Sequence, residues 1–579
     1  MPGFRITNFT CNSKMINYKY ANTINDNLVC NNWLISRSTL NKFLNDKLLF
    51  ENNDYVVLLE GVALNSIELI TEYDKDNWHD TVNYLVAEKE NWFSLLEGPL
   101  SGAVYYKKGD KWVVFTGKLG EKAIFYCEED GKIIVGSQLN YVTDVMHEKN
   151  MKVNPDEDAL KHFMAYQSYI GDETCVKNVK RLYPGQNLVI KDNTITVKQY
   201  CLFDVKQDEN RKFEKEYIDM LDNSFRRAMK RIIDKNHEYG YKTIADISGG
   251  YDSRTNCYVL KSLGAEDVVM DCYAQSGSHD HEVSNAIASE LGYDYVFRSL
   301  DNASCMYGID DNILMLNGAT PYFGITGGRD MLQMLSGLNT GLEVTGLLGD
   351  VHDGSMVRTR CDGDIDVGDY RDSKTLIEGK DYIFPQIENE RFENHVNEHY
   401  WFYNRGMIFG MSSFFIRQNF TEAVTPFGDS EFIKTYLSIP WEMRVKGKLL
   451  QKWLAWKYPE SAKYIDGKTG MPLEKEINPS YEFVGKIRRQ FKIYKNRILK
   501  DRRPKGMNDV AYWYKNNPNF HKYIISHINQ NKKLIRYYPE IESLTYKLMT
   551  SKSVFDILIV VSVLSIFKNF IISGETENV

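Results

Sequence analysis

The chain has 579 residues, of which 43% are apolar and 26% are charged, and its formal net charge is −7. A single hydrophobic core rarely grows beyond about 250 to 300 residues, so we expect two or three domains. The composition is that of a globular protein, and the weak negative charge gives no general reason to expect binding to nucleic acid or membranes.

The nine cysteines include no CxxC pair, so neither a structural zinc site nor a disulfide framework is indicated. Reduced thiols in a cytoplasmic protein are the expectation. The first residues contain no apolar segment of signal-peptide length. The most apolar run, Ile557 to Phe567, is shorter than the roughly 20 residues of a membrane span. We therefore predict a buried helix there and no transmembrane anchor.

Short β-branched and aromatic runs, separated by GD, DG and DN turns, characterise the first 200 residues. They include YVVLLEGVAL, GAVYYKKGDKWVVFTG, AIFYCEEDGKIIVGS and QNLVIKDNTITVKQY. Runs of this kind are typical of β-hairpins. We expect an antiparallel sheet domain that ends near Tyr200, with helices such as Asp156 to Tyr166 packed on it.

Helices and strands then alternate. FEKEYIDMLDNSFRRAMKRIIDKN predicts a helix, and KTIADI, DVVMDCYA and YDYVFRSL predict strands separated by helices that end at Gly264 and Gly292. This alternation predicts right-handed crossovers and a doubly wound parallel sheet. The fold class is α/β and α+β, with domains at 1–205 and 206–480 and a helical C-terminal extension at 481–579.

The stretch DISGGYDSR, Asp246 to Arg254, lies at the carboxyl end of a predicted strand, where open α/β sheets bind ligands. Amides in a glycine turn and at a helix N-terminus attract anions, and Ser248 and Ser253 add hydroxyls. Asp252 would repel a bare phosphate, so it indicates a bridging Mg²⁺. An ordinary strand-to-helix turn capped by Ser248 explains the glycines but not the whole SGGxDS set. The stretch therefore predicts a site for a metal-bound polyphosphate.

SGGYDSR resembles the pyrophosphate loop of the ATP pyrophosphatases (the PP-loop class), and specifically that of the asparagine synthetases. TGLLGDVHDGS, VTPFGDSEF, GKLLQKW and DGKTGMPL are similar to later segments of that family. Upstream, GVALN, LEGPLSGAVYY and GKLGEKAIFY resemble its N-terminal class II glutamine amidotransferase domain. Several motifs in the same order are more specific than any one of them.

The resemblance implies an Ntn-type αββα sandwich followed by an ATP-pyrophosphatase domain that uses ATP and Mg²⁺. Its chemistry would be attack of a carboxylate on the α-phosphorus of ATP, release of pyrophosphate, and displacement of AMP from the acyl-adenylate by ammonia or an amine. Asp252 and Asp350 fall on the family's metal-binding aspartates, and Lys468 falls on its active-site lysine. The positions expected to bind nucleotide are Ile247, Ser248, Gly249, Gly250, Asp252, Ser253, Tyr273 and Gly346.

Three positions depart from the family. Pro2 stands where the nucleophilic cysteine is expected, and Gly117 where an aspartate would hold the glutamine amine, so we expect glutaminase activity to be lost. Leu347 replaces the glutamate that deprotonates the incoming nitrogen, a loss that typically costs about 10²–10⁴-fold in rate. His352 is the candidate replacement base, with a helix-capping role as the alternative, and Glu343 lies just upstream.

The prediction is an asparagine synthetase-like, ATP-dependent carbon–nitrogen ligase that takes ammonia from solution or from a separate glutaminase. Its substrate would be aspartate or another small-molecule carboxylate. The alternatives are a carboxylate on a glycan precursor or peptide, because family members from bacterial surface-polysaccharide and modified-peptide pathways carry similar extensions, and a nucleotide-binding scaffold without turnover. A homodimer is one candidate assembly.

Two charged segments have simpler interpretations. HDHE, from His279 to Glu282, resembles a metal cluster, but acidic residues in the first turn suit a helix dipole, so a helix start is favoured. Lys486 to Lys505 is basic with interleaved aromatics, and a solvated helical face is favoured over a nucleic-acid or polyanion surface.

Overall fold

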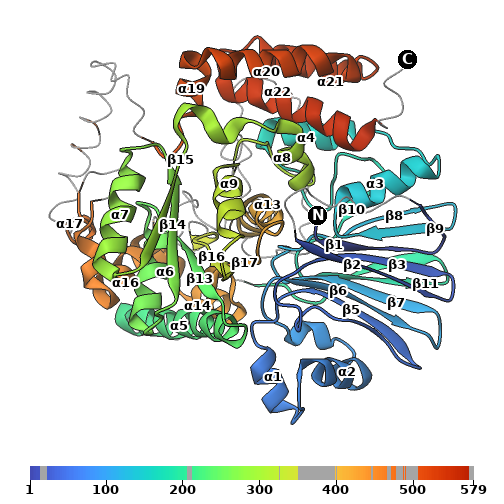
Figure 1. Ribbon diagram of the computed structural model, residues 1–579, viewed down its shortest axis with the longest axis horizontal. Helices are drawn as coiled ribbons and strands as arrows, with labels where there is room; N and C mark the ends of the chain where they lie inside the picture. The colour runs from blue at the N-terminus through green and yellow to red at the C-terminus, as the bar shows by residue number, and fades with distance from the viewer. Residues whose placement is uncertain are drawn as a thin grey trace.

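The computed structural model describes residues 1–12, 22–204, 212–324, 326–349, 398, 401–444, 447–465, 471–477, 487, 490 and 506–572. These residues form three sheets with helices around them (Figure 1). The predicted domain boundaries at 205/206 and 480/481 lie outside the described residues and stay predictions.

Two six-stranded antiparallel sheets stack face to face in the first 200 residues (Figure 1). Their strand orders are β10-β8-β9-β1-β3-β2 and β12-β11-β7-β6-β5-β4. Apolar residues of both inner faces, among them Ile6, Val56 and Val114, alternate along their strands and form the core between the sheets. The strands are β1 (Gly3–Thr7), β2 (Thr23–Cys30), β3 (Trp33–Leu40), β4 (Leu49–Glu51), β5 (Tyr55–Gly61), β6 (Leu100–Tyr106), β7 (Lys111–Thr116), β8 (Phe125–Glu129), β9 (Lys132–Gly136), β10 (Lys180–Arg181), β11 (Gln186–Lys191) and β12 (Thr194–Gln199).

Helices cover the outer faces of this pair. Helices α1 (Ser66–Glu72) and α2 (Trp78–Glu88) contribute to an apolar cluster with strands β5 to β7. Helices α3 (Leu139–Glu148) and α4 (Glu157–Tyr166) pack on the sheet that contains β8 and β9. The predicted hairpins and the α4 helix are confirmed. The three strands before residue 41 were not predicted.

A five-stranded parallel sheet follows, with the order β15-β14-β13-β16-β17. Strands β14 and β15 lie on one side of β13, and the later strands β16 and β17 lie on its other side. The order therefore reverses between β13 and β16, and ligands bind outside the carboxyl ends of strands at such a point. The strands are β13 (Lys242–Asp246), β14 (Val268–Ala274), β15 (Asp294–Ser299), β16 (Thr340–Val344) and β17 (Ala423–Val424).

Helices flank the parallel sheet on both faces, and the predicted alternation is confirmed (Figure 1). A 25-residue helix, α5, carries its apolar face onto the sheet, and α6 and α7 are the predicted crossovers between the first three strands. The helices are α5 (Glu214–Glu238), α6 (Tyr251–Ser262), α7 (His279–Leu291), α8 (Ile309–Met315), α9 (Thr326–Leu335), α13 (Ser413–Arg417), α14 (Ser430–Ser438), α15 (Trp441–Arg444), α16 (Lys448–Lys457) and α17 (Leu473–Glu476).

Within residues 506–572, the described C-terminal part contains four α-helices: α19 (Val510–Asn516), α20 (Pro518–Asn531), α21 (Pro539–Met549) and α22 (Val554–Ile566). They pack on α3 and α4 and on α8, so one apolar cluster joins all three regions (Figure 1). The segment Val554–Ile571 is long and apolar enough to cross a membrane, but 78% of it is buried inside the protein. This burial is that of a core helix, as the sequence predicted.

Buried ion pairs join the antiparallel and parallel regions. Glu422, directly before β17, binds Lys47 at 2.8 Å and Lys122 at 2.9 Å. Lys235 of α5 binds Asp46 at 3.1 Å. Removing one partner of a buried pair leaves an uncompensated charge, so these contacts fix how the two regions sit together.

Candidate functional site

Residues 247–250 form the glycine loop between β13 and α6, at the carboxyl end of the central strand. The Ser248 amide donates to Ser253 Oγ at 3.1 Å, and the Gly250 amide donates to Ser248 Oγ at 3.1 Å. The two hydroxyl oxygens lie 3.0 Å apart. Gly250, rather than Ser248, is the residue that precedes the first turn of α6. The side-chain oxygens of the two serines therefore accept hydrogen bonds from amides of the loop and stabilise its tight turn.

The segment after β16 packs against the start of α6. A Cβ on Gly346 would stand 2.9 Å from the Ser253 amide nitrogen, and a Cβ on Gly349 would stand 2.3 Å from Asp252 Cγ. Asn256 of α6 donates to the Thr345 carbonyl at 2.9 Å. Only glycine permits this approach, so the segment after β16 meets the first turn of α6 at the point where the strand order reverses.

The first turn of α7 also contacts the glycine loop. The Gly249 amide donates to Asp280 Oδ1 at 3.0 Å, and a Cβ on Gly249 would stand 2.7 Å from His279 Cδ2. Ser278 caps α7 by accepting from the His281 amide at 3.3 Å, so the predicted helix start is confirmed. The contact of Asp280 with the loop was not predicted. No group of three or more His, Cys, Asp or Glu side chains suited to a metal ion occurs among the described residues.

The fully buried side chain of Arg254 binds the backbone of the glycine loop. One guanidinium nitrogen donates to the Gly249 carbonyl at 2.9 Å, and another donates to the Ser461 carbonyl at 3.1 Å. Arg254 thus links the glycine loop to the segment that follows α16. The SGGxDS pattern gave no signal for this residue, which lies one position beyond it.

Charged side chains are buried under the loop. Arg417 of α13 pairs with Glu343 of β16 and lies 3.2 Å from Asp246 Oδ2. Burial, together with repulsion from Asp246, raises the pKa of Asp271 well above its usual value. Burial also raises the pKa of Asp246. Glu343 is fully buried and held by Arg417, so it is not placed to accept a proton from an incoming nitrogen.

The predicted nucleotide-binding residues separate into two groups. Tyr273 of β14 accepts from Arg417 at 3.0 Å, and its ring packs against the backbone of Gly327 and Gly328. It forms a wall near the carboxyl end of β14, toward α13 and α9. The residues brought together at the loop are Ile247, Ser248, Gly249, Gly250, Asp252, Ser253 and Gly346.

Three predicted catalytic residues, Asp350, His352 and Lys468, lie outside the described residues, as does most of Lys486–Lys505. Leu347 is described. Its carbonyl accepts from Thr425 Oγ1 at 2.7 Å, and its side chain packs against the main core. Position 347 therefore presents an apolar side chain beside the loops.

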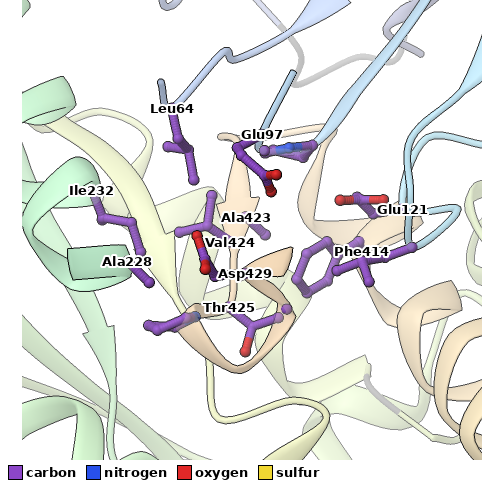
Figure 2. A pocket seen from close by; sticks show the side chains of 15 residues that line it. Leu64, Glu97, Glu121, Ala228, Ile232, Phe414, Ala423, Val424, Thr425 and Asp429 are labelled. Atoms are coloured by element: carbon purple, nitrogen blue, oxygen red, sulfur yellow. The ribbon is translucent and has the colours of Figure 1, made fainter. Parts of the chain in front are cut away.

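A cavity lies between the antiparallel and parallel regions (Figure 2). Its lining comes from the turn before β6, the turn after β7, helix α5 and the segment around β17. Glu97, Glu121 and Asp429 bring carboxyl groups to it, and Thr425, which binds Leu347, forms part of its floor. Thr425 therefore connects the lining of the cavity to the loop after β16.

The three carboxyls differ in their partners. Glu97 binds Lys118 at 2.5 Å, and Asp429 binds Arg231 at 2.8 Å. Glu121 has no basic partner within salt-bridge distance in the part of the chain that the structure describes. Burial raises the pKa of Glu121 to about 7, and burial followed by repulsion from Glu97 raises the pKa of Asp429 to about 6.

Residues 47–201 match the sequence profile of a family described as a glutamine amidotransferase domain. The N-terminal region contains a class II glutamine amidotransferase-type domain. Among curated proteins none matches. Two solved structures that resemble the chain are a glutamine phosphoribosylpyrophosphate amidotransferase from B. subtilis complexed with ADP and GMP, and an allosteric regulatory enzyme of purine biosynthesis. The first is 12% identical over 47% of this chain and 78% of that one, and the second 10% identical over 51% and 74%. Both TM-scores are 0.23, which supports no conclusion about this chain.

Two departures from the expected amidotransferase pattern have structural counterparts in this domain. Pro2 precedes β1 and accepts from the Gln138 side chain at 2.9 Å, so no thiol stands at the start of that strand. Cys11 is the first cysteine in the sequence, and it lies beyond the other end of β1, about 16 Å along a five-residue strand. At Gly117, a Cβ would stand 2.8 Å from Glu121 Oε2, so the Glu121 carboxyl fills the space beside this glycine.

Proposed function

We propose that the chain is an ATP- and Mg²⁺-dependent carbon–nitrogen ligase that forms an amide through an acyl-adenylate, in the manner of asparagine synthetases. The observation that supports this most is the contact of the first turn of α6, directly after the glycine loop, with the Gly346–Gly349 segment at the reversal point of a parallel sheet. The carboxyl of Asp252 lies there against the residue that directly precedes Asp350.

The loop residues suit a polyphosphate. Two glycines leave the backbone bare, α6 directs its N-terminal amides at the same place, and Ser248 and Ser253 carry hydroxyls. Phosphate oxygens would replace Ser248 Oγ and Asp280 Oδ1 as acceptors for the glycine amides. Asp252 is the described carboxylate suited to hold Mg²⁺, which supplies charge neutralisation for the leaving pyrophosphate.

In this proposal the loop amides, the serine hydroxyls and the two buried arginines have different roles. The glycine amides and serine hydroxyls would bind and orient the phosphates, Arg254 would hold the loop in shape, and buried Arg417 would keep the sheet edge rigid. Leu347 offers no base for the incoming nitrogen. The amine must therefore arrive neutral or lose its proton to another group.

The amidotransferase-type domain would have lost glutamine hydrolysis in this proposal. A nucleophilic thiol is needed for that step, and Pro2 supplies none. Ammonia from solution or from a separate glutaminase would serve as nitrogen donor. The carboxylate would be aspartate, another small acid, or a carboxylate on a glycan precursor or peptide.

A nucleotide-binding scaffold is the second candidate, and the apolar side chain at Leu347 is the observation that favours it. The decisive experiment is exchange of labelled pyrophosphate into ATP, with Mg²⁺ and a panel of carboxylates. Exchange with any carboxylate supports the ligase. ATP binding without exchange supports the scaffold, and no ATP binding contradicts both.

Asp252→Asn is the matched test of the site. We expect it to lower the exchange rate by about 10²-fold or more, because it removes the carboxylate assigned to Mg²⁺. Asp267→Asn is the control, since Asp267 is exposed just before β14, at the opposite edge of the same sheet. Equal rates for the two variants would remove Asp252 from the proposed site.

A further inference from the structure

Strand β2 forms an edge of its sheet that lacks the usual protection against pairing. It has eight residues and ends the order β10-β8-β9-β1-β3-β2, and no other strand pairs with its outer edge among the described residues. Edge strands are normally protected by lysine, proline or a bulge, or are kept very short. β2 contains no lysine or proline, and its register with β3 continues without a bulge over all eight residues. Its outer edge can therefore pair with another strand.

The other edges of the three sheets, as far as the structure describes them, are protected. Strands β10, β4 and β17 have only two or three residues. The longer edge strands carry exposed charges, Lys198 in β12 and Asp294 in β15. In β2 the single charged residue, Asp26, binds Arg37 of the neighbouring strand at 2.5 Å and is neutralised there. β2 is thus the exception among these edges.

Hydrogen bonding determines which backbone groups of β2 face outward. The Asn41 amide donates to the Asn22 carbonyl at 2.8 Å, directly before the eight paired residues. Hydrogen-bonded and non-hydrogen-bonded pairs alternate along an antiparallel ladder, so the even-numbered residues of β2 bond to β3. The odd-numbered residues therefore direct their amides and carbonyls away from the sheet. They are Thr23, Asn25, Asn27 and Val29.

These four residues lie symmetrically about Asp26, so the edge of β2 is complementary to itself. An antiparallel copy centred on Asp26 places Asn25 opposite Asn27 and Thr23 opposite Val29, and each pair can exchange two backbone hydrogen bonds. The carboxamides of Asn25 and Asn27 can also bond to each other, and the Val29 side chain, which is 70% exposed, gains an apolar contact. All outward amides and carbonyls of both strands are then paired.

We propose that the chain forms a symmetric dimer in which β2 pairs antiparallel with β2 of a second copy. The pairing joins the two sheets into one and removes both exposed edges. A second copy is favoured over an unrelated extended peptide because the symmetry of the edge satisfies every outward group at once. This proposal does not depend on the proposed ligase activity.

Analytical ultracentrifugation of the full chain tests the dimer, with circular dichroism to confirm that each variant is folded. We expect a monomer–dimer equilibrium that depends on concentration. Asn27→Pro removes one outward amide and should raise the dimer Kd by about 10-fold or more, because the symmetry applies the loss twice. Asn25→Lys adds the kind of charge that protected edges carry and should act in the same direction. Thr196→Lys, at an exposed position of the edge strand β12, should leave Kd unchanged.

Disulfide formation tests the register of the pairing. The two copies of Asp26 would face each other in a non-hydrogen-bonded pair, where the Cα atoms are about 4.5 Å apart and within reach of a disulfide. Asp26→Cys should therefore cross-link the dimer under mild oxidation. The two copies of Thr23 would lie about 20 Å apart, so Thr23→Cys should not cross-link. The wild type, with its native cysteines, is the reference.

A monomer at all concentrations overturns the proposal. Slow deuterium exchange of the Asn25 and Asn27 amides in such a monomer would show that another segment of the same chain covers the edge, and fast exchange would show that water does. The proposal is equally overturned if a dimer forms whose Kd is unchanged in Asn27→Pro and Asn25→Lys. Cross-linking of Thr23→Cys as fast as that of Asp26→Cys would also contradict it.

Discussion

The carboxyl carbon of Asp252 lies 2.3 Å from the position that a Cβ on Gly349 would take. No side chain fits at residue 349 while Asp252 keeps its place. Asp252 is in the first turn of α6, directly after the glycine loop, and Gly349 follows β16. This contact therefore joins the two parts of the proposed site.

Gly349→Ala should therefore weaken ATP binding in the presence of Mg²⁺. We expect Kd to rise by about 10-fold or more, which corresponds to about 1.4 kcal/mol for displacing Asp252. Isothermal titration calorimetry measures it. Gly337→Ala is the control, because a Cβ there would meet only the Met334 carbonyl at 3.9 Å. An unchanged Kd in Gly349→Ala would show that Asp252 takes no part in nucleotide binding.

Asp280 places a negative charge on the glycine loop. Asp280→Asn keeps an oxygen acceptor for the Gly249 amide and removes that charge. If the loop binds triphosphate, Kd for ATP should fall by about 3- to 10-fold, as expected for loss of a repulsive charge at this range. Asp294→Asn, at an exposed surface pair with Lys242, should leave Kd unchanged. Weaker binding by Asp280→Asn would instead show that the carboxylate is needed on the loop or the metal.

The sequence predicted the parts of this region that depend on local pattern. The strand β13, the glycine turn and α6 follow from apolar periodicity and from glycine chemistry within one continuous stretch. It did not predict that Asp280 binds Gly249, since the contact joins residues 31 positions apart and depends on how α7 lies against the sheet. Nor did it predict that β1 pairs between β3 and β9, because such non-local pairing leaves no trace in a short window.

The buried charges show a second limit of sequence patterns. Glu343 is next to apolar residues in β16, and the pattern alone left it as a candidate base. Its role depends on Arg417, which comes from a helix about 70 positions away and neutralises it. The apolar sequence pattern predicts strand β16 correctly. The ion-pair partner of its buried Glu343 is known only from the packed structure.

Arg417→Met should destabilise the protein strongly. It leaves Glu343 and Asp246 buried without their cation, which typically costs about 3–5 kcal/mol in free energy of unfolding. Urea denaturation followed by fluorescence measures the loss. Arg227→Met is the matched control, because the pair of Arg227 with Glu431 is about half exposed and should contribute about 0–1 kcal/mol. Similar losses for the two variants would contradict the buried network.

Glu121 predicts a specific dependence of stability on pH. Burial raises its pKa from 4.5 to about 7, so between these values the folded state binds more protons than the unfolded state. Its contribution to the free energy of unfolding is therefore full below about pH 4.5 and falls by about 1.4 kcal/mol per unit as pH rises toward 7. Urea denaturation from pH 4.5 to 8, at constant ionic strength, should show this fall in the wild type. Glu121→Gln cannot ionise and should have a correspondingly flatter profile, whereas Glu431→Gln should follow the wild type. Parallel profiles for the wild type and Glu121→Gln would mean that the Glu121 carboxyl titrates in the folded protein near its ordinary value, and that burial does not raise its pKa.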